Sequence, residues 1–259
     1  KQLISNSLLA FKSSQNALLE SPTGTGKSLA ILSATLSFLE TNSKVKKVFY
    51  TSKDQSKLRK LVGEFKKLPY SPQMSILASK RHLCIVPQVA QSKSPDYECK
   101  KLCEEVGGCP YNNPYKKVGF DIEDVKVPNN DSIPIEFTNQ GIKPKFDLDD
   151  LKEYGLQNKI CPYQLAFNIY HTSKLVFCPY NYILKANDNK NLLFDFQKNT
   201  TIAIFDEGHN IENIAREEAS LTLTLKQIID SQNEVKNVPQ DDSFRTLFNQ
   251  VQRLQIDVI

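Results

Sequence analysis

The sequence predicts an α/β fold in which helices cover a parallel sheet, and three observations support this prediction. Short apolar runs typical of buried strands alternate with longer amphipathic segments typical of helices. A glycine-rich turn joins one of these runs to the helical segment that follows it. A later apolar run ends in two carboxylates. Since parallel strands need a crossover connection, usually a helix, this order favours a parallel sheet.

The expected elements follow from the spacing of apolar residues. In chain order they are a helix over 3–12, a strand over 17–20, a helix over 29–39, a strand over 45–50, a helix over 55–65, a helix over 162–171, and strands over 175–178 and 201–205. Cys178 lies in such an apolar run and is expected to be a small core residue. From about residue 84 to 160 regularity fails, and this polar stretch is expected to bury little apolar surface. After about residue 220 the pattern is helical and polar.

Composition sets broad limits on the class of protein. The 259 residues are 40% hydrophobic and 24% charged, which is typical of a globular protein. No run approaches the roughly 18 apolar residues of a membrane helix, so we expect no membrane contact. The net charge of +4 permits a polyanionic partner without requiring one. The chain begins with Lys1 rather than Met, so we expect it to be part of a longer protein.

Residues 21–28 form the first motif that carries chemistry: Ser21, Pro22, Thr23, Gly24, Thr25, Gly26, Lys27 and Ser28. The segment matches a phosphate-binding loop, with Ser21 where the usual pattern begins with glycine. Gly24 and Gly26 allow backbone N–H groups to face phosphates, and the following helix adds its positive N-terminal end. We expect Lys27 to reach the β- and γ-phosphates of ATP and Ser28 to ligate Mg²⁺.

The apolar run at 201–205 ends in a second motif, which contains Asp206, Glu207 and His209. An acidic residue at the end of a strand holds Mg²⁺ in phosphate-loop ATPases, and we expect Asp206 to take this role. Glu207 is expected to activate the attacking water as a general base. His209 is expected to couple the γ-phosphate region to nucleic acid. Two carboxylates alone often mark a solvated turn, but with the phosphate loop they indicate ATP hydrolysis.

Together these motifs resemble the XPD-like branch of superfamily 2 DNA helicases, which carry an iron–sulfur cluster. Residues 206–209 are similar to the family's DEAH box, with Gly208 in place of Ala, and residues 20–28 are similar to its motif I. Residues 50–53 resemble motif Ia, although the family's following Thr-His-Ser-Gln is replaced here. Similar matches occur at residues 79–84, 161–163, 178–182 and 205–220. The last of these favours the subgroup that contains the Fanconi anaemia group J and regulator of telomere length helicases.

The resemblance implies four parts in the chain. A RecA-like motor domain, with a parallel sheet and flanking helices, is expected in two segments, 1–83 and 162–220. A mostly helical iron–sulfur domain is inserted between them at 84–161, and a helical Arch domain begins at 221–259. The family's second motor domain, whose arginines stabilise the transferring phosphoryl group, has no counterpart here. We therefore expect this part alone to bind ATP weakly and to hydrolyse it very slowly.

Clustered cysteines indicate a metal site. Four of the six cysteines fall between residues 84 and 109, and in an intracellular chain such clusters more often bind metal than form disulfides. The resemblance assigns the [4Fe–4S] ligands to Cys84, Cys109 and Cys161, with Cys99 preferred to Cys103 as the remaining ligand. Structural zinc is the alternative, although its usual paired spacing occurs only once, at Cys99 and Cys103.

The remaining implications concern DNA. Motif Ia implies DNA contacts at Thr51, Ser52 and Lys53. Arg81, which in the family supports the cluster region, is also expected to contact DNA. Gln2 is expected to read the adenine of ATP. The implied activity is that of an ATP-dependent 5′-to-3′ DNA helicase in DNA repair and genome maintenance. We expect a nuclear monomer that binds single-stranded or forked DNA, with repair or replication proteins as partners.

Two other functions fit the same residues. The first is a phosphate-loop ATPase that uses a zinc-stapled insertion to bind a protein and does not unwind DNA. The second is a non-enzymatic scaffold, although the presence of Lys27, Ser28, Asp206 and Glu207 argues against lost catalysis. The identity of the metal and binding to single-stranded DNA separate these functions from a helicase.

Overall fold

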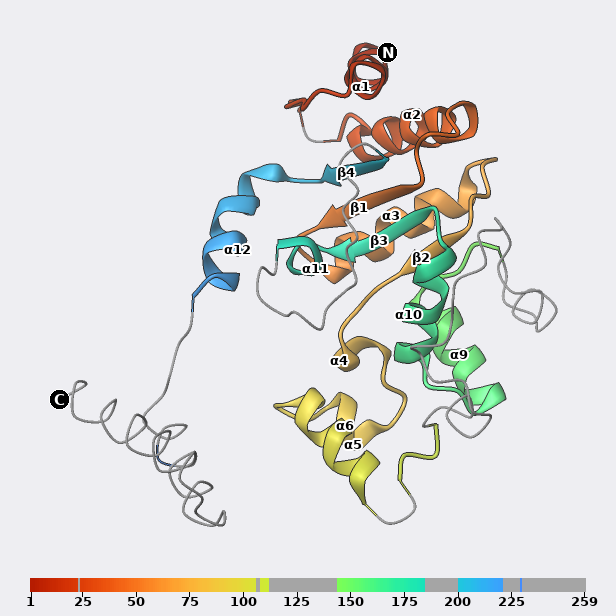
Figure 1. Ribbon diagram of the computed structural model, residues 1–259, viewed down its shortest axis with the longest axis vertical. Coiled ribbons are helices and arrows are strands. Elements are labelled where there is room, and N and C mark those ends of the chain that lie inside the picture. The colour runs from red at the N-terminus through yellow and green to blue at the C-terminus, as the bar shows by residue number, and fades with distance from the viewer. Residues whose placement is uncertain (23, 106–107, 112–143, 185–199, 221–228, 230–259) are drawn as a thin grey trace, which may run out of the picture. The chain divides into compact units, whose positions relative to one another are not determined.

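The structure of the chain is a computed structural model (Figure 1). It describes residues 1–22, 24–105, 108–111, 144–184, 200–220 and 229. The chain divides into two compact units, 1–215 and 216–259, and the elements discussed below belong to the first unit, apart from a last helix that crosses the boundary. Thr23 of the phosphate loop lies outside the described residues, as does the expected Arch segment apart from Ile229.

Four parallel strands form one sheet, in the order β2-β3-β1-β4 (Figure 1). The strands are β1 (Lys47–Ser52), β2 (Met74–Ile76), β3 (Leu175–Pro179) and β4 (Thr201–Phe205). β1 lies between β3 and β4, with Tyr50 paired to Phe177 on one side and to Ile204 on the other. The predicted α/β fold with a parallel sheet is confirmed. β2 was not expected, because three residues are too few to give a recognisable pattern.

The helices cover the sheet and extend from it. They are α1 (Gln2–Ser13), α2 (Lys27–Thr41), α3 (Gln55–Lys67), α4 (Lys80–Leu83), α5 (Pro87–Ala90), α6 (Pro95–Glu104), α9 (Leu148–Asn158), α10 (Pro162–Thr172), α11 (Asn181–Leu184) and α12 (Ile211–Glu218), with a short 3₁₀ helix, η1 (Gly208–Asn210). All four helices predicted before residue 172 are present. None of the described helices has both the length and the apolar character needed to cross a bilayer.

Aromatic side chains on β1 bind a helix to each face of the sheet, because successive strand residues point to opposite faces. On one face, the Tyr50 ring lies 6.2 Å from Phe177, which lies 5.7 Å from Phe65 of α3. On the other face, the Phe49 ring lies 6.3 Å from Tyr170 of α10. All five side chains are buried. Burial of these apolar side chains stabilises the packing of the helices on the sheet.

The predicted strand at residues 17–20 is wrong. Residues 15–22 form no regular element, and the Leu18 side chain is 96% exposed. A strand needs backbone partners on a neighbouring strand, and within the described residues the edge strand β4 pairs only with β1. The phosphate loop therefore follows an irregular segment, although it does open a helix as expected.

The expectation of irregular, poorly buried backbone up to residue 160 is wrong for α9. Asp147 and Asp150 form a capping box at its N-terminus, which satisfies backbone N–H groups that the helix leaves unpaired. Both carboxylates also pair with Lys66 of α3. Leu148 is fully buried in the main core. The end of the expected insertion thus packs against the motor domain, while the boundary at residue 161 stays a prediction.

Candidate nucleotide site and cysteine cluster

The phosphate loop has the backbone that its glycines permit. Gly24 has φ 77° and Gly26 has φ 74°, both in the left-handed region that side chains disfavour. Gly26 is also the N-cap of α2. The Thr25 hydroxyl donates to the Pro22 carbonyl at 2.8 Å, so the 2.7 Å contact between Ser21 Oγ and Thr25 Oγ1 uses the Ser21 proton. These contacts hold the loop curled over the start of α2.

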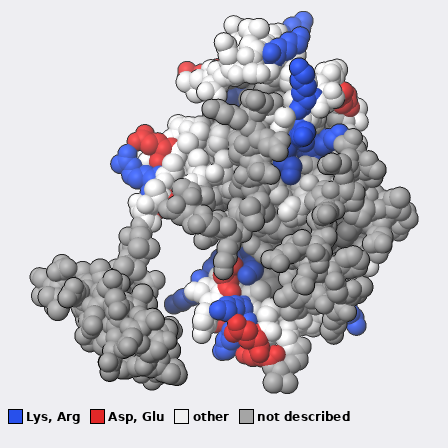
Figure 2. Space-filling model, in the orientation of Figure 1, with Lys and Arg blue, Asp and Glu red and all other residues white. Residues whose placement is uncertain are grey.

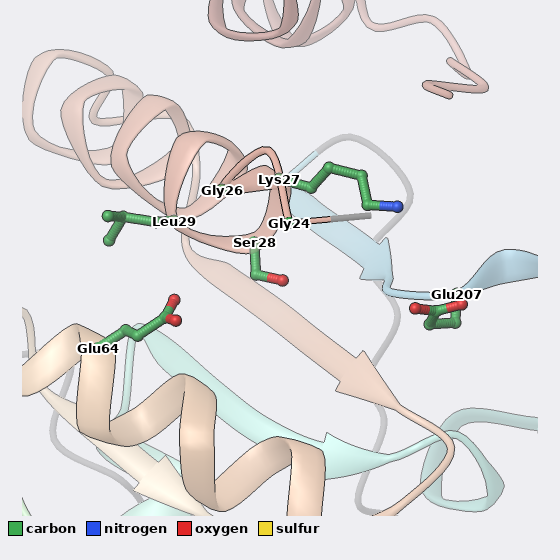
Figure 3. Close-up of a pocket in the computed structure, with 7 residues that line it drawn as sticks. All are labelled: Gly24, Gly26, Lys27, Ser28, Leu29, Glu64 and Glu207. Atoms are coloured by element: carbon green, nitrogen blue, oxygen red, sulfur yellow. The ribbon is translucent and has the colours of Figure 1, made fainter. Parts of the chain in front are cut away.

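A cavity of about 260 Å³ lies in front of this loop (Figure 3). Its lining residues come from the loop, from α2 and α3, and from the end of β4: Gly24, Gly26, Lys27, Ser28, Leu29, Glu64 and Glu207. Lys27 Nζ donates to the Ser21 carbonyl at 2.8 Å, so the ammonium group lies over the loop. The predicted phosphate-binding residues and the predicted general base thus line one cavity.

The expected Mg²⁺ ligands lie side by side. Ser28 Oγ donates to Asp206 Oδ2 at 3.4 Å, across 178 residues of sequence. Burial raises the pKa of Asp206, and the nearby charge of Glu207 raises it further, against the opposing effects of Ser28 and two lysines. A hydroxyl and a partly desolvated carboxylate are suitable oxygen ligands for Mg²⁺. The two side chains therefore fit the ion that the family implies.

Two side chains hold the backbone at the end of β4. The Thr51 hydroxyl donates to the Ile204 carbonyl at 2.8 Å, and Asp206 N donates to the Thr51 carbonyl at 2.9 Å. The Tyr180 hydroxyl donates to the Asp206 carbonyl, and burial raises the pKa of Tyr180. Thr51 therefore has an internal role, and the side chain of the neighbouring Ser52 is also buried.

Glu207 has an unusual backbone conformation. Its φ of 62° lies in the left-handed region, which costs a non-glycine residue on the order of 1 kcal/mol or more. Lys57 Nζ lies 3.6 Å from one carboxylate oxygen and His209 Nδ1 lies 3.6 Å from the other. Asn210 Nδ2 donates to the Glu207 carbonyl at 3.1 Å. These contacts hold the turn that aims Glu207 at the cavity.

The other predicted site residues lie away from this cavity. Lys53 is exposed at the end of β1, and Gln2 is exposed at the start of α1. Arg81 is exposed, and its Nη2 donates to the Lys93 carbonyl at 3.3 Å. Gln2 is absent from the described lining of the cavity. Of the three predicted motif Ia contacts, only Lys53 has its side chain at the surface.

Five thiols gather on one side of the motor domain. Burial raises the pKa of Cys84, and the thiols of Cys161, Cys99 and Cys109 raise it further, in that order. Burial likewise raises the pKa of Cys103, and the thiols of Cys99, Cys109 and Cys161 raise it further. All are free thiols. Within the described residues, no three of them are close enough together to hold a single metal ion.

Cys178, by contrast, is fully buried in β3. It belongs to the core cluster of the sheet, and burial raises the pKa of its thiol. The expectation of a small core residue is confirmed.

The cysteines join two differently packed regions. Cys84 is the C-cap of α4 and follows Leu83, which is fully buried, while Cys161 is the N-cap of α10. Cys99 and Cys103 lie one turn apart on α6, a helix that contributes no buried residue. A helix without buried side chains gains little from packing, so α6 needs another source of stability.

Charges of both signs surround α6. Lys80 Nζ lies 3.1 Å from Asp96 Oδ1 and 5.3 Å from the centre of the Tyr163 ring, and Lys100 Nζ lies 3.9 Å from Glu104 Oε1. In the view of Figure 2, blue and red side chains lie together at the end of the molecule that carries α6. The described surface there is mixed in charge rather than purely basic.

Three residues near the site, Glu64, Lys57 and Tyr180, were assigned no role from the sequence. Glu64 and Lys57 belong to an amphipathic helix whose polar side reads as solvated, and their roles depend on where α3 packs. Tyr180 carried a usable signal, because it follows β3 directly. The carboxyl ends of parallel strands meet at one edge of a sheet, where Asp206 also lies.

Comparisons with known proteins agree with this geometry. The DEAD_2 family model matches residues 50–228, well over half of the chain. Two solved structures share the fold: one described as "XPD_Helicase", with a TM-score of 0.55, and one described as "Truncated XPD", with a TM-score of 0.57. Each is 20% identical, and they cover 96% and 98% of this chain, which spans 39% and 65% of theirs.

Curated relatives include three proteins named regulator of telomere elongation helicase 1 or its homologue. The rat protein is 27% identical over 88% of this chain, the human protein 28% over 81%, and the Caenorhabditis elegans homologue 30% over 86%. The chain spans only 20%, 19% and 24% of their respective lengths. The family match, which covers well over half of the chain and agrees with the parallel sheet and the paired nucleotide motifs, shows that the chain belongs to the DEAD_2 family.

Proposed function

We propose that this chain is the ATP-binding part of a DNA helicase that acts in genome maintenance. The observation that carries the proposal is the contact between Ser28 and Asp206 beside the phosphate loop. Ser28 lines the cavity together with Glu207. Residues far apart in sequence thereby form the donor set of a phosphate-loop ATPase.

The residues of the cavity have separate tasks in ATP hydrolysis. The left-handed backbone at Gly24 and Gly26 presents N–H groups to the phosphates, and Lys27 leaves the Ser21 carbonyl to meet the γ-phosphate. Ser28 and Asp206 would hold Mg²⁺, which would neutralise phosphate charge when bound. Glu207 accepts a proton from the attacking water. No arginine is among the described lining residues, so we expect slow turnover from this chain alone.

We also propose that four thiols hold a [4Fe–4S] cluster. The five thiols outside the core are reduced and partly buried, and Cys84 lies near enough to Cys161, Cys99 and Cys109 for them to raise its pKa. Cysteine thiolates are the ligands that hold iron–sulfur clusters. Cys84 and Cys161, at the ends of α4 and α10, would tie the cluster to the main core, Cys99 would tie it to α6, and Cys109 would be the fourth ligand. The cluster would supply α6 with stability that its packing does not provide.

Cys99 remains our preferred ligand over Cys103. The thiol of Cys99 influences Cys84, Cys103 and Cys161, so it lies among all of them. Cys103 lies one turn away on α6 and is also close to Cys109 and Cys161, so it stays the alternative ligand.

The DNA partner is proposed to be single-stranded or forked DNA, with 5′-to-3′ movement by family resemblance. Lys53 lies exposed at the carboxyl edge of the sheet, one residue beyond the buried Thr51 and Ser52. Lys53 directly follows β1, and the carbonyl of Thr51 in β1 accepts a hydrogen bond from the backbone N–H of Asp206. A DNA phosphate bound at Lys53 would therefore be connected to Asp206 through β1. The names of the telomere helicase relatives support a role in the nucleus, alongside repair or replication proteins.

A binding experiment tests the ATP site. A fluorescent ATP analogue is titrated into the chain with Mg²⁺, for the wild type and for Lys27→Ala. We expect Lys27→Ala to weaken binding at least tenfold, because it removes the charge that meets the phosphates. Lys12→Ala, at an exposed lysine of α1, is the control and should bind like the wild type. Equal affinity for all three proteins would contradict the proposed site.

Metal analysis separates a helicase from the zinc-stapled alternative. The chain is purified without oxygen, and iron, acid-labile sulfide and zinc are measured. We expect about four iron and four sulfide per chain and a broad visible absorbance. Cys99→Ser should lose iron and Cys103→Ser should keep it. One zinc per chain without iron would remove the cluster and leave an ATPase with no support for unwinding.

A further inference from the structure

Tyr180 connects the ends of three strands beside the nucleotide site. It directly follows β3, and its backbone N–H donates to the carbonyl of Ser52, the last residue of β1, at 3.2 Å. Its ring packs 5.6 Å from the ring of Phe205, the last residue of β4. β1 lies between β3 and β4, and neighbouring strands are about 4.8 Å apart, so only a long side chain can span β1. The Tyr180 side chain is fully buried along this path.

The hydroxyl of Tyr180 ends at the peptide that joins Asp206 to Glu207. It donates a hydrogen bond to the Asp206 carbonyl, which belongs to that peptide. Burial raises the pKa of Tyr180, and the carboxylates of Asp206 and Glu207 raise it further, so the phenol keeps its proton and remains a donor. The side chain therefore binds the backbone between the two residues that carry the proposed chemistry.

This peptide leads into a strained turn. Glu207 has φ 62° and ψ 49°, a left-handed conformation that side chains disfavour. Before the peptide, the Asp206 carboxylate accepts from Ser28 Oγ at 3.4 Å, and after it, Glu207 lines the cavity (Figure 3). If Glu207 relaxed to an ordinary negative φ, the peptide would rotate and the residues on both sides of it would shift.

We infer that Tyr180 is a positioning residue of the nucleotide site, because its hydroxyl holds the peptide between Asp206 and Glu207 in the turn that presents both carboxylates to a magnesium-bound nucleotide. This inference rests on the proposed nucleotide site. Thr51 holds the carbonyl of Ile204 before this peptide, and Asn210 holds the carbonyl of Glu207 after it. Tyr180 thus supplies the contact at the peptide itself, which preorganises the carboxylates before the ligand arrives.

Tyr180→Phe tests the inference, because it removes the hydroxyl and keeps the ring against Phe205. The affinity for an N-methylanthraniloyl-ADP probe is measured in excess Mg²⁺ and again in EDTA. In Mg²⁺ we expect Tyr180→Phe to weaken binding about threefold to tenfold, the loss of one hydrogen bond. In EDTA it should bind as the wild type does. The affinity for Mn²⁺ in the presence of the probe, measured by electron paramagnetic resonance, should fall in parallel.

Tyr170→Phe is the matched control. Tyr170 is also buried, but its carbonyl accepts from Lys47 Nζ at 3.1 Å, and Lys47 is the first residue of β1. This tyrosine therefore lies at the amino end of the parallel strands, whereas Asp206 follows the carboxyl end of β4. Tyr170→Phe should leave the effect of Mg²⁺ on probe binding unchanged. A thermal unfolding curve for each variant shows whether its fold is intact.

A double-mutant cycle with Glu207→Gly gives a second readout. Glycine adopts the left-handed conformation without a steric cost, so the turn no longer needs the same support. Relative to Glu207→Gly alone, the double variant should lose much less Mg²⁺-dependent affinity than Tyr180→Phe loses relative to the wild type. The double variant also decides the question if Tyr180→Phe alone does not fold: it should fold and bind the probe like Glu207→Gly.

The outcomes separate the role of Tyr180 from the nucleotide site. Unchanged binding by Tyr180→Phe, equal weakening with and without Mg²⁺, or an undiminished loss in the Glu207→Gly background would overturn the inference and leave the nucleotide site intact. A wild-type chain whose probe binding does not depend on Mg²⁺ would overturn both the magnesium site and the role of Tyr180.

Discussion

The negative charge of Asp206 would favour binding of Mg²⁺, but it destabilises the fold of the free protein. It is half-buried beside Glu207, and its pKa is raised for both reasons. A carboxyl group whose pKa is higher in the folded state binds more protons there than in the unfolded chain. Its ionisation therefore lowers the free energy of unfolding as pH rises from the unfolded to the folded pKa. Above that window the folded chain carries the full cost until Mg²⁺ offsets it.

Asp206→Asn is expected to separate stability from binding. At neutral pH the variant should unfold at the same temperature as the wild type or a higher one, because the desolvated charge is gone. It should also lose the Mg²⁺-dependent part of nucleotide binding. Thermal unfolding at pH 4 and pH 8, with and without Mg²⁺ and ADP, checks both effects. A lower melting temperature at pH 8 would show that Asp206 stabilises the free fold.

At the residue scale, the sequence could predict groups whose chemistry is local. Gly24, Gly26 and Lys27 belong to one short motif, and the structure places them together at the cavity. Glu64 could not be recognised, because it lies in an ordinary helix pattern. Its relevance arises only when α3 packs beside the phosphate loop, an arrangement that no local spacing encodes.

At the scale of elements, the junction between α9 and α10 is the tightest connection beside a proposed cluster ligand. Gly155 of α9 lies against this junction, and a Cβ atom there would lie 2.6 Å from the Ile160 carbonyl oxygen and 2.6 Å from Pro162 Cγ. Cys161 lies between these two residues. Close packing therefore ties the position of a thiol to the end of a helix in the core.

Gly155→Ala is expected to disturb both stability and metal content. The added methyl group must displace the chain around Cys161, at a cost of about 1–3 kcal/mol. Iron per chain should fall as well. Gly63→Ala is the matched control, since no atom lies within 4 Å of its Cβ position on α3. It should stabilise the protein by about 0.5–1 kcal/mol. Urea unfolding and iron analysis of both variants provide the check, and a fully iron-loaded, stable Gly155→Ala would contradict it.

Helices and strands were predicted correctly where the pattern of the segment itself determines its structure. The prediction failed where the structure depends on pairing or packing with other segments. The run at 201–205 became β4 with the predicted bounds, because its pattern and its carboxylate ending are both local. The run at 17–20 is equally apolar but lacks a strand to pair with in the described sheet. α9 was missed because its apolar residues lie in a polar setting, although its capping residues were visible.

At the scale of the whole molecule, the described region has one extensive core and an attached helix, α6, with no buried residue. Removal of iron by a chelator should therefore release α6 before it affects the sheet. Hydrogen exchange should rise at residues 95–104 and stay low at α3 and β1. Uniform acceleration across the chain would indicate that the metal supports the entire fold, and no change at α6 would argue against a cluster there.

Binding of DNA depends on charges at the surface of the molecule. Replacement of exposed Lys53 by Ala should weaken binding to single-stranded DNA by a few-fold and reduce its salt dependence, since a phosphate contact releases counterions. Lys60→Ala, which replaces an exposed lysine of α3, is the control. Fluorescence anisotropy at several salt concentrations measures both. Equal slopes for Lys53→Ala and the wild type would remove this lysine from the DNA-binding surface.

The position of Cys161 at the start of α10 has a consequence for variants far from any thiol. α10 packs on the core along its length, with Leu165, Ala166 and Tyr170 buried, so a cavity made in that core is expected to loosen the helix that presents the cysteine. Purified variants with such core substitutions would contain little iron and show little colour, although all their cysteines are present. A weak brown colour would then indicate damage to the hydrophobic core. A variant that appears unable to acquire iron could owe this defect to a lost hydrophobic side chain.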